Sequence, residues 1–434
     1  MKMFNAKDTK KTSKKWAWLT MLLIGILAVG TVSCDEDDSD DNNTVTPEPE
    51  EVESAYMIPY SVDGASGRVA YLKISENVPE IIDVENSVEL GLGVQIFGIG
   101  DNPFAWNSNA QTITKYAVDR TDLSVSIEGI ISLASLGFGS SFPAPAAVSD
   151  SIAYFFDLAE GVAIEWNYKN MEIKEVLNVE PYADYIISNE FVSFIPYVEG
   201  EKILMSIRER PITVCCDIGN INGIGATVAV FDVATKTLKY NSDDTSIAAF
   251  NEVRIDTDGS IYVIPTRENA FFEPYYNYTG TSSPHVILKL NQDGTFDPNF
   301  SFDLASVIPD LEIIEIIPAI LNGKAIVQYY SSDDASLDTV AFDDKLAVPR
   351  TFGTKSVAVD LATGEVTEFT AFEKYDFTAF VPETRGELYV VGYSQVVNPF
   401  DRVHFLRVNS FDSYTELTTY DNIAGGTLFK LWGD

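Results

Sequence analysis

The feature that most constrains the fold is a strand–turn–strand unit that recurs along the chain. TVAVFDVATKTLKY (227–240) is repeated closely by SVAVDLATGEVTEFT (356–370). Runs rich in Val, Ile, Tyr and Phe, punctuated by Gly and Asp, indicate strands, and helical periodicity is nearly absent. The body of the chain is therefore predicted to be all-β and built from repeats. Looser copies of the unit occupy residues 69–84, 112–127, 286–300 and 403–417.

A second unit, made of two strands joined by a tight glycine turn, precedes several copies of the first. Two hairpins in alternation, at roughly fifty residues per pair, give a four-stranded sheet repeated around a ring, which is the pattern of a β-propeller. We expect seven four-stranded blades in residues 55–434, with six or eight as alternatives and two β-sandwich domains as the rival fold. Copies of the second unit occupy residues 191–207, 250–265, 315–330 and 377–393.

The last segment, TLFKLWGD (427–434), reads as a strand without a partner of its own. We expect it to pair beside YMIPYSV (56–62), because that pairing closes the ring and removes an open sheet edge.

Strand direction predicts where the longer connections emerge. If the four strands of a blade alternate in direction, the first and third turns lie on one face of the disc and the second connection lies on the other. The first and third turns here are tight, as at Asp258-Gly259 and Thr363-Gly364, and only reverse the chain. The long connections all occupy the second position, so we expect them on a single face. They cover residues 208–226, 266–285, 331–355 and 394–402.

One of these connections, residues 266–285, is crowded with aromatic side chains although its Pro, Gly, Asn and Ser content indicates a loop. Leaving a large ring exposed forgoes about 1.5–3 kcal/mol of free energy that its burial would contribute. The loop is therefore expected either to pack on itself or to be covered by a ligand. Arginines also favour these connections, and guanidinium groups with rings suit planar, anionic or aromatic ligands. The alternative is that these arginines only pair with the abundant carboxylates. The candidate ligand contacts are Arg208, Arg210, Arg267, Phe271, Phe272, Tyr275, Tyr276, Tyr278, Arg350 and Arg402.

Several kinds of chemistry have little support in the sequence. The two histidines, His285 and His404, offer little for a histidine metal site or a Ser-His-Asp triad, although His285 could touch a ligand. Cys215 and Cys216 are adjacent, which excludes an ordinary disulfide between them. From residue 55 onward, 23 Lys and Arg stand against 54 Asp and Glu, a net charge of −31 that repels nucleic acid. We expect neither catalysis nor a cofactor, and the sequence identifies no metal-ligating residues, although it does not reveal whether a metal is bound.

The N-terminus reads as a targeting segment. Six lysines precede the apolar run WAWLTMLLIGILAVGTV, and Thr31-Val32-Ser33-Cys34 closes it. This resembles a bacterial lipoprotein signal, residues 1–33, in which Cys34 becomes the lipidated first residue. A transmembrane anchor is the alternative. Residues 35–54 contain ten acids and no base, so residues 34–54 are predicted to form a disordered tether.

The acidic run behind the lipobox also resembles the export signal of Bacteroidota surface lipoproteins, with a plain solvated spacer as the alternative. The segment LNQDGTFDPNF (290–300) resembles a DG-x-x-D-x-x-F propeller repeat. With the lipobox, the acidic run and this repeat, the chain resembles Bacteroidota β-propeller lipoproteins associated with TonB-dependent uptake. That resemblance implies an outer-membrane, lipid-anchored protein facing the cell exterior.

The same resemblance implies capture of a ligand, in the better understood relatives an iron–siderophore complex, and its transfer to a TonB-dependent receptor. Two alternatives from other classes stay open. One is a glycan-binding surface lipoprotein whose aromatic side chains stack on sugar rings, and the other is a propeller enzyme such as a glycosidase or lyase.

Overall fold

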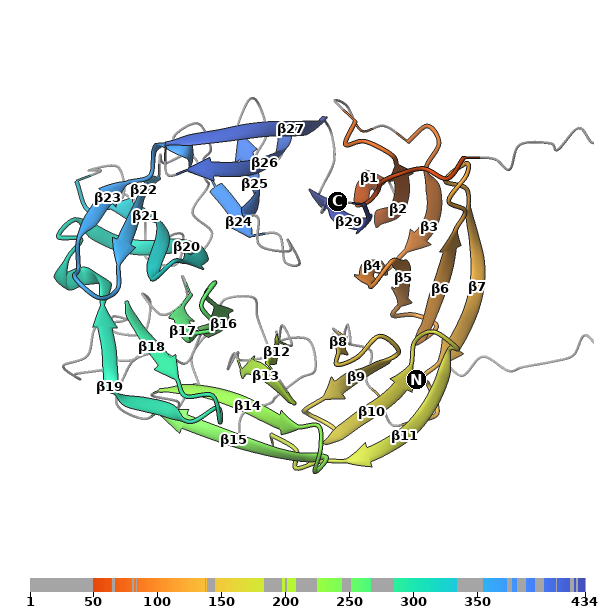
Figure 1. Cartoon of the computed structure of the whole chain (residues 1–434), viewed down its shortest axis with the longest axis horizontal. Helices are drawn as coiled ribbons and strands as arrows, with labels where there is room; N and C mark the ends of the chain where they lie inside the picture. Colours follow the sequence, from red (N-terminus) through yellow and green to blue (C-terminus); the bar gives the residue numbers. More distant parts are fainter. Residues whose placement is uncertain are drawn as a thin grey trace, which may run out of the picture. The chain divides into compact units, whose positions relative to one another are not determined.

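The strands of the computed structural model form seven sheets that follow one another around a ring (Figure 1). The structure describes residues 50–64, 67–79, 82, 84–136, 138, 145–182, 197–199, 201–207, 225–243, 251–266, 285–333, 354–372, 377–380, 388–394, 402–410, 412–421, 425–426 and 428–433. Residues 50–434 form one compact unit. Within the described residues the elements are β-strands and two short 3-10 turns, with no α-helix.

The seven sheets are numbered here in chain order. Sheet 1 contains β1 (Ala55–Gly64), β2 (Gly67–Ser75) and β3 (Val88–Leu92), with β28 (Gly425–Gly426) and β29 (Phe429–Trp432) paired to β1. Sheet 2 contains β4 (Val94–Ile99), β5 (Asn102–Asn107), β6 (Thr112–Val118) and β7 (Val125–Ser132). Sheet 3 contains β8 (Ala146–Ala147), β9 (Ile152–Asp157), β10 (Val162–Asn167) and β11 (Glu172–Asn178).

The remaining sheets have the same order of strands. Sheet 4 contains β12 (Tyr197–Glu199), β13 (Lys202–Ile207), β14 (Ala226–Asp232) and β15 (Thr237–Asp243). Sheet 5 contains β16 (Asn251–Ile255), β17 (Ile261–Pro265), β18 (Val286–Leu290) and β19 (Phe296–Asp303). Sheet 6 contains β20 (Leu311–Leu321), β21 (Lys324–Ser331), β22 (Lys355–Asp360) and β23 (Val366–Glu368). Sheet 7 contains β24 (Phe377–Phe380), β25 (Leu388–Ser394), β26 (Arg402–Ser410) and β27 (Ser413–Asp421). The 3-10 turns are η2 (Leu304–Ser306) and η4 (Thr370–Phe372).

Each sheet runs from an inner strand near the axis of the ring to an outer strand at its edge (Figure 1). Neighbouring strands are antiparallel throughout, and the outer strand of one sheet leads to the inner strand of the next. This arrangement, with seven sheets among the described residues, confirms the predicted all-β propeller.

Burial explains why the middle strands read as continuous apolar runs. In β17 all five residues are buried, whereas the three residues of outer strand β23 are exposed. A middle strand is covered on both faces by the neighbouring sheets, so alternation gives way to an unbroken run of Ile, Val and Tyr. The outer strands face solvent and keep polar residues.

The core consists of apolar clusters wedged between neighbouring sheets. Between sheets 2 and 3, Phe104 meets Trp166 edge to face at a centroid distance of 5.6 Å, and Phe155 stacks on Trp166 at 4.7 Å. Burying each such ring contributes about 1.5–3 kcal/mol. Between sheets 7 and 1, Phe405 packs with Ile58 and Tyr60, so apolar packing also joins the last sheet to the first.

The C-terminal strand closes the ring as predicted. β29 pairs antiparallel with β1, placing Trp432 opposite Ala55 and Phe429 opposite Met57. The first sheet is thus built from both ends of the chain, and its inner edge is covered.

One expected hairpin differs from the structure. The segment 69–84 was expected to contain two strands, but β2 ends at Ser75 and β3 begins only at Val88. The intervening stretch contains Pro79 and several acids, which are poor strand formers.

Candidate functional site

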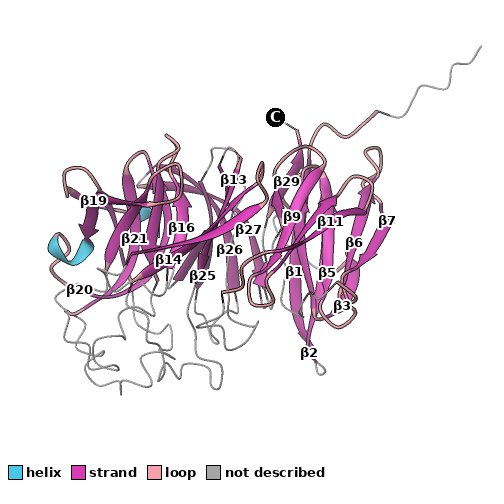
Figure 2. Ribbon diagram, turned by 90° about the horizontal axis from the view of Figure 1, so that it is seen from below, coloured by secondary structure: helices cyan, strands magenta, loops and turns pink. Residues whose placement is uncertain are grey.

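The two faces of the ring differ in how the strands are connected. We call the tight-turn face the one that carries the turns between first and second and between third and fourth strands. Neighbouring turns on it are bonded to each other: Gly323 N donates to Asp256 Oδ2 at 2.7 Å, and Thr257 Oγ1 donates to Asn322 Oδ1 at 2.8 Å. In the side view of Figure 2, the strands stand side by side across the thickness of the ring, between the two faces.

We call the opposite face the insertion face, because second strands end and third strands begin there. The chain leaves sheets 4 to 7 at this face after Ile207, Pro265, Ser331 and Ser394, and re-enters at Ala226, Val286, Lys355 and Arg402. In sheets 2 and 3 the equivalent connections, 108–111 and 158–161, are short turns. The described strand ends therefore place the four predicted connections on one face, in four consecutive sheets, whereas the twelve-residue connection 76–87 of sheet 1 lies on the tight-turn face and departs from the predicted parity.

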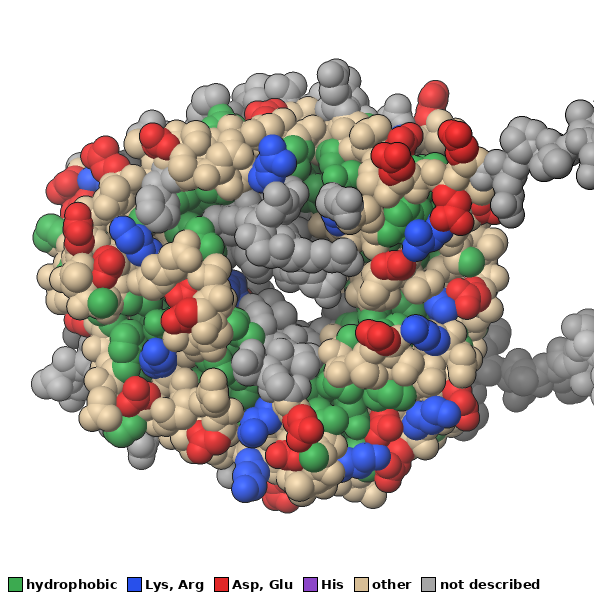
Figure 3. Space-filling view, viewed as in Figure 1, with side chains coloured by type: hydrophobic (Ala, Val, Ile, Leu, Met, Phe, Trp, Pro, Cys, Tyr) green, Lys and Arg blue, Asp and Glu red, His purple; other side chains and the backbone are tan. Residues whose placement is uncertain are grey.

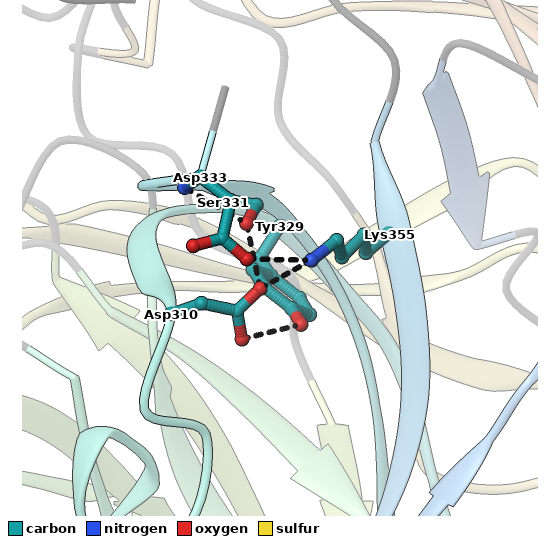
Figure 4. Close-up of polar contacts among 5 residues, drawn as sticks. All are labelled: Asp310, Tyr329, Ser331, Asp333 and Lys355. Atoms are coloured by element: carbon teal, nitrogen blue, oxygen red, sulfur yellow. Dashed lines mark hydrogen bonds and ion pairs between the residues drawn. The ribbon is translucent and has the colours of Figure 1, made fainter. Parts of the chain in front are cut away.

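The best defined polar cluster on the insertion face surrounds Asp310, and we call it the Asp310 cluster (Figure 4). Asp310 lies between η2 and β20, where the chain crosses from sheet 5 to sheet 6. Tyr329 OH donates to its Oδ1 at 3.1 Å, and Ser331 Oγ donates to its Oδ2 at 2.6 Å. Lys355 Nζ lies 2.5 Å from the same Oδ2. The cluster therefore joins the end of β21 and the start of β22 to the crossing between sheets.

Two further contacts extend this cluster. Ser332 N donates to the backbone oxygen of Asp310 at 2.8 Å, and Lys355 Nζ lies 3.4 Å from Asp333 Oδ2. Asp333 N donates to Ser331 Oγ at 3.2 Å. Both ends of the connection between β21 and β22 are thus bonded to Asp310.

The contacts within the cluster keep Asp310 and Lys355 ionised and Tyr329 neutral. Partial burial alone would raise the pKa of Asp310, but hydrogen bonds from Lys355, Ser331 and Tyr329 outweigh it and lower the pKa to about 2. The hydrogen bond with Asp310 raises the pKa of Lys355, and burial followed by the Asp310 charge raises the pKa of Tyr329. A general acid or base works best with a pKa near the working pH. Asp310 is therefore suited to holding the two ends of the connection between β21 and β22, and not to proton transfer at neutral pH.

His285 lies at the point where the aromatic connection re-enters sheet 5. Its residue is 6% exposed, and burial lowers its pKa to about 4 against the opposing influence of Asp303 and a hydrogen bond with the backbone of Glu312. Its backbone oxygen accepts from Leu304 N at 3.1 Å. His285 is thus buried in a setting that favours its neutral form, and the expectation that it could touch a ligand stays a prediction.

A buried arginine lies on an inner strand, and sequence reasoning did not single it out. Arg254 in β16 is 5% exposed, pairs with Glu252 two residues earlier and donates to the backbone oxygen of Val253 at 3.1 Å. A charged side chain on an inner strand resembles any exposed position in sequence, so no pattern marks it.

A second charged cluster links sheets 3 and 4. Lys236, in the turn between β14 and β15, lies 2.6 Å from Glu165 Oε2 and 2.6 Å from Glu175 Oε2. Tyr154 OH donates to Glu165 Oε2 at 2.8 Å. Lys236 extends from a turn of sheet 4 on the tight-turn face to two carboxylates of sheet 3. This cluster therefore joins two sheets and is not part of the insertion face.

The candidate contacts named from the sequence lie outside the described residues, with one partial exception. Arg402 is the first residue of β26, where its backbone pairs with Ser394 and Asp421, while its side chain is not described. The residues outside are Arg208, Arg210, Arg267, Phe271, Phe272, Tyr275, Tyr276, Tyr278 and Arg350, together with Cys34. What the structure adds is the place where their connections begin and end.

Two further features are absent from the described residues. Among them, no group of three or more His, Cys, Asp or Glu side chains is placed to hold a metal ion. No helix in the described part of the chain is long and apolar enough to cross a membrane.

Comparisons with known proteins show distant likenesses in fold. No family model matches the chain, and no curated protein matches it. A solved protein from Lactobacillus plantarum is 11% identical with a TM-score of 0.43, covering 87% of this chain and 99% of its own. The periplasmic gluconolactonase of Pseudomonas aeruginosa gives 11% identity, a TM-score of 0.43 and coverages of 86% and 99%. Apo AztD from Citrobacter koseri is 8% identical with a TM-score of 0.39, and the match covers 87% of this chain and 98% of its own. Similarities this low carry no functional argument.

Proposed function

We propose that this chain is a non-catalytic, lipid-anchored surface protein that captures an extracellular ligand on its insertion face. The observation that carries the proposal is that four consecutive sheets send their long connections out from the same face. Connections gathered on one face of a rigid ring make a binding surface without disturbing the core.

The residue types in those connections favour an anionic, aromatic ligand. Five candidate arginines and five candidate aromatic side chains belong to them, on a body whose net charge is −31. Forked hydrogen bonds and cation–π contacts favour a planar anion over a neutral sugar. A ferric catecholate siderophore has both properties, and a TonB-dependent receptor would receive it.

The Asp310 carboxylate on the insertion face has a structural role that is consistent with a non-catalytic protein. Its clearest carboxylate, Asp310, is occupied by three donors and has a pKa of about 2. A carboxyl of this kind fixes geometry and does not exchange a proton near pH 7.

The test is a titration of the purified protein, residues 34–434, with a ferric tris-catecholate complex and with a panel of neutral oligosaccharides. Quenching of intrinsic fluorescence is followed, with free tryptophan as the control for absorption by the iron complex. Saturable quenching by the iron complex alone supports siderophore capture. Binding of the sugars alone would replace it by glycan capture, and product release from any sugar would identify an enzyme.

A further inference from the structure

The N-terminal end of the described chain is bonded firmly to the ring before β1 begins. Val52 N donates to the backbone oxygen of Arg120 at 2.7 Å, and Trp432 Nε1 donates to the backbone oxygen of Val52 at 3.1 Å. Ser54 Oγ donates to the backbone oxygen of Glu76 at 3.1 Å. Three separate segments of the ring therefore hold residues 52–54, and we call this set of contacts the clasp.

The partners in the clasp all lie on the tight-turn face. Arg120 is in the turn between β6 and β7. Glu76 directly follows β2, which is the third strand of sheet 1 when the inner strand, β28 and β29, is counted as the first. Trp432 ends β29 opposite Ala55, where the first strand of sheet 1 meets the second. Arg120 and Glu76 lie in third connections, and Trp432 ends β29 beside the start of β1, so the clasp is at the face opposite the four insertions.

Arg120 gives the clasp a charged centre. Its guanidinium lies 4.7 Å from the ring centroid of Trp432, a cation–π distance. It also contacts Asp101 Oδ2 at 3.1 Å and approaches Glu51 Oε2 at 4.0 Å. Asp101 is in the turn between β4 and β5, on the same face. The chain is thus held at one defined exit point.

We infer that the tight-turn face is the membrane-facing side of the protein and that the insertion face points away from the membrane. This inference rests on the proposed function, because it takes the anchor to be at Cys34. A chain anchored there must reach the ring at the clasp, and the four long connections leave and re-enter the ring at the opposite face.

The lengths support this orientation. Sixteen residues separate the ring at Glu50 from the membrane, counting Cys34 to Pro49, and a flexible chain of that length has a root-mean-square span of about 20–24 Å. A six-residue strand alone spans about 20 Å. If the insertion face pointed toward the membrane, residues 34–49 would have to cross the thickness of the ring from the clasp to the opposite face and also pass around the edge of the ring.

The described side chains of the tight-turn face carry charges of both signs. Figure 3 views this face and shows Asp and Glu side chains interspersed with Lys and Arg around the ring. Because the described side chains of this face mix both signs of charge, the exit point of the chain sets the orientation. A ligand on the insertion face would then be presented to the medium, where a receptor reaching above the membrane could take it.

The orientation can be tested with the chain from residue 34, in a Cys215→Ser, Cys216→Ser background, coupled through Cys34 to a maleimide lipid in vesicles. A donor dye is placed on azidophenylalanine at Asn170, in the turn between β10 and β11, or at Ala110, in the turn between β5 and β6. Both are exposed, and they lie on the tight-turn and insertion faces. Energy transfer to an acceptor on the lipid headgroups is measured for each.

Because the two turns are separated by a strand length of about 20 Å, transfer from position 170 should exceed that from position 110 about twofold. Equal or reversed transfer would overturn the inference. In an Arg120→Ala, Trp432→Ala chain, which opens the clasp, the difference should shrink, and an undiminished difference would contradict the role of the clasp.

Natural anchoring is tested separately, because the maleimide lipid replaces it in the vesicles. In cells, the intact chain should be found with the membrane and its Cys34→Ser variant should not. If both behave alike, the proposed anchor is wrong while the vesicle result still reports the geometry.

Discussion

The ammonium of Lys355, at the start of β22, lies 2.5 Å from Oδ2 of Asp310, at the crossing from sheet 5 to sheet 6. The Asp310 side chain is 21% exposed and that of Lys355 is half exposed. The pair therefore lies where its charge interaction is only partly screened by water. It fixes the base of one long connection on the insertion face.

Asp310→Asn should destabilise the protein in a pH-dependent way. The pKa of Asp310 falls from an ordinary 3.8 to about 2 on folding. Its stabilisation, about 1–2 kcal/mol, is therefore complete above pH 4 and lost as the pH falls from about 4 to about 2. Urea unfolding at pH 7 and at steps down to pH 2 should show the wild type and the variant converging.

The matched control is Asp333→Asn, which removes the second carboxylate near Lys355. That contact is 3.4 Å long and the Asp333 side chain is 77% exposed, so the change should cost less than about 0.5 kcal/mol at any pH. Equal losses in the two variants would show that Asp310 has no special role.

The buried His285 predicts a second pH dependence, in a higher range. Burial lowers its pKa from 6.5 to about 4 in the folded chain, so the unfolded chain binds the proton first as the pH falls. Stability should decrease by on the order of 3 kcal/mol between pH 6.5 and pH 4. His285→Gln should be less stable at pH 7 yet lose less on acidification. Parallel pH profiles for the two proteins would contradict the assignment.

Two glycines with similar backbone angles separate a steric clash from backbone strain. Gly294 and Gly323 have φ values of +84° and +76°. A Cβ at Gly294 would approach Val230 Cγ2 to 2.5 Å, whereas one at Gly323 would meet nothing within 4 Å. Gly323→Ala should therefore cost about 1–2 kcal/mol, and Gly294→Ala about 2–5 kcal/mol because overpacking adds to the strain. Thermal and urea unfolding would measure both, and equal costs would contradict the packing of sheet 5 against sheet 4.

Trp432→Phe should loosen the clasp while keeping an aromatic ring. The change removes the donor to the Val52 oxygen, at a cost of about 1–2 kcal/mol. Hydrogen exchange at the Val52 amide should become faster. Trp106→Phe is the control, since Trp106 is buried between sheets 2 and 3. Trp106→Phe should lower overall stability through lost packing. Hydrogen exchange at the Val52 amide should then increase only as far as the loss of global stability accounts for.

The sequence could predict the propeller because its signals are local. Tight turns such as Asp258-Gly259 separate apolar runs of strand length, and counting them gave the position of runs such as β17 within their sheets. The same counting placed Pro265 and Ser331, where two long connections start, on one face. These conclusions need only strand direction, which every turn reverses.

The Asp310 cluster could not be predicted, because its members come from three places in the chain. Asp310 precedes an inner strand, Tyr329 and Ser331 end the next one, and Lys355 follows a long connection. Among 54 acids, nothing local distinguishes Asp310. The two-residue strand β8, Ala146–Ala147, was missed for a similar reason, since it is held by pairing with β9 and not by its own composition.

The central claim is that the ligand binds on the insertion face. Calorimetric titration with a ferric tris-catecholate should compare the wild type, an Arg208→Ala, Arg267→Ala variant and a Lys169→Ala, Lys239→Ala variant. The control pair removes the same charge from exposed positions outside the insertion face, in the turn between β10 and β11 and on β15. The arginine variant should bind about tenfold or more weakly and the lysine variant as the wild type does. Equal affinities in all three, or equal losses in both variants, would contradict the account.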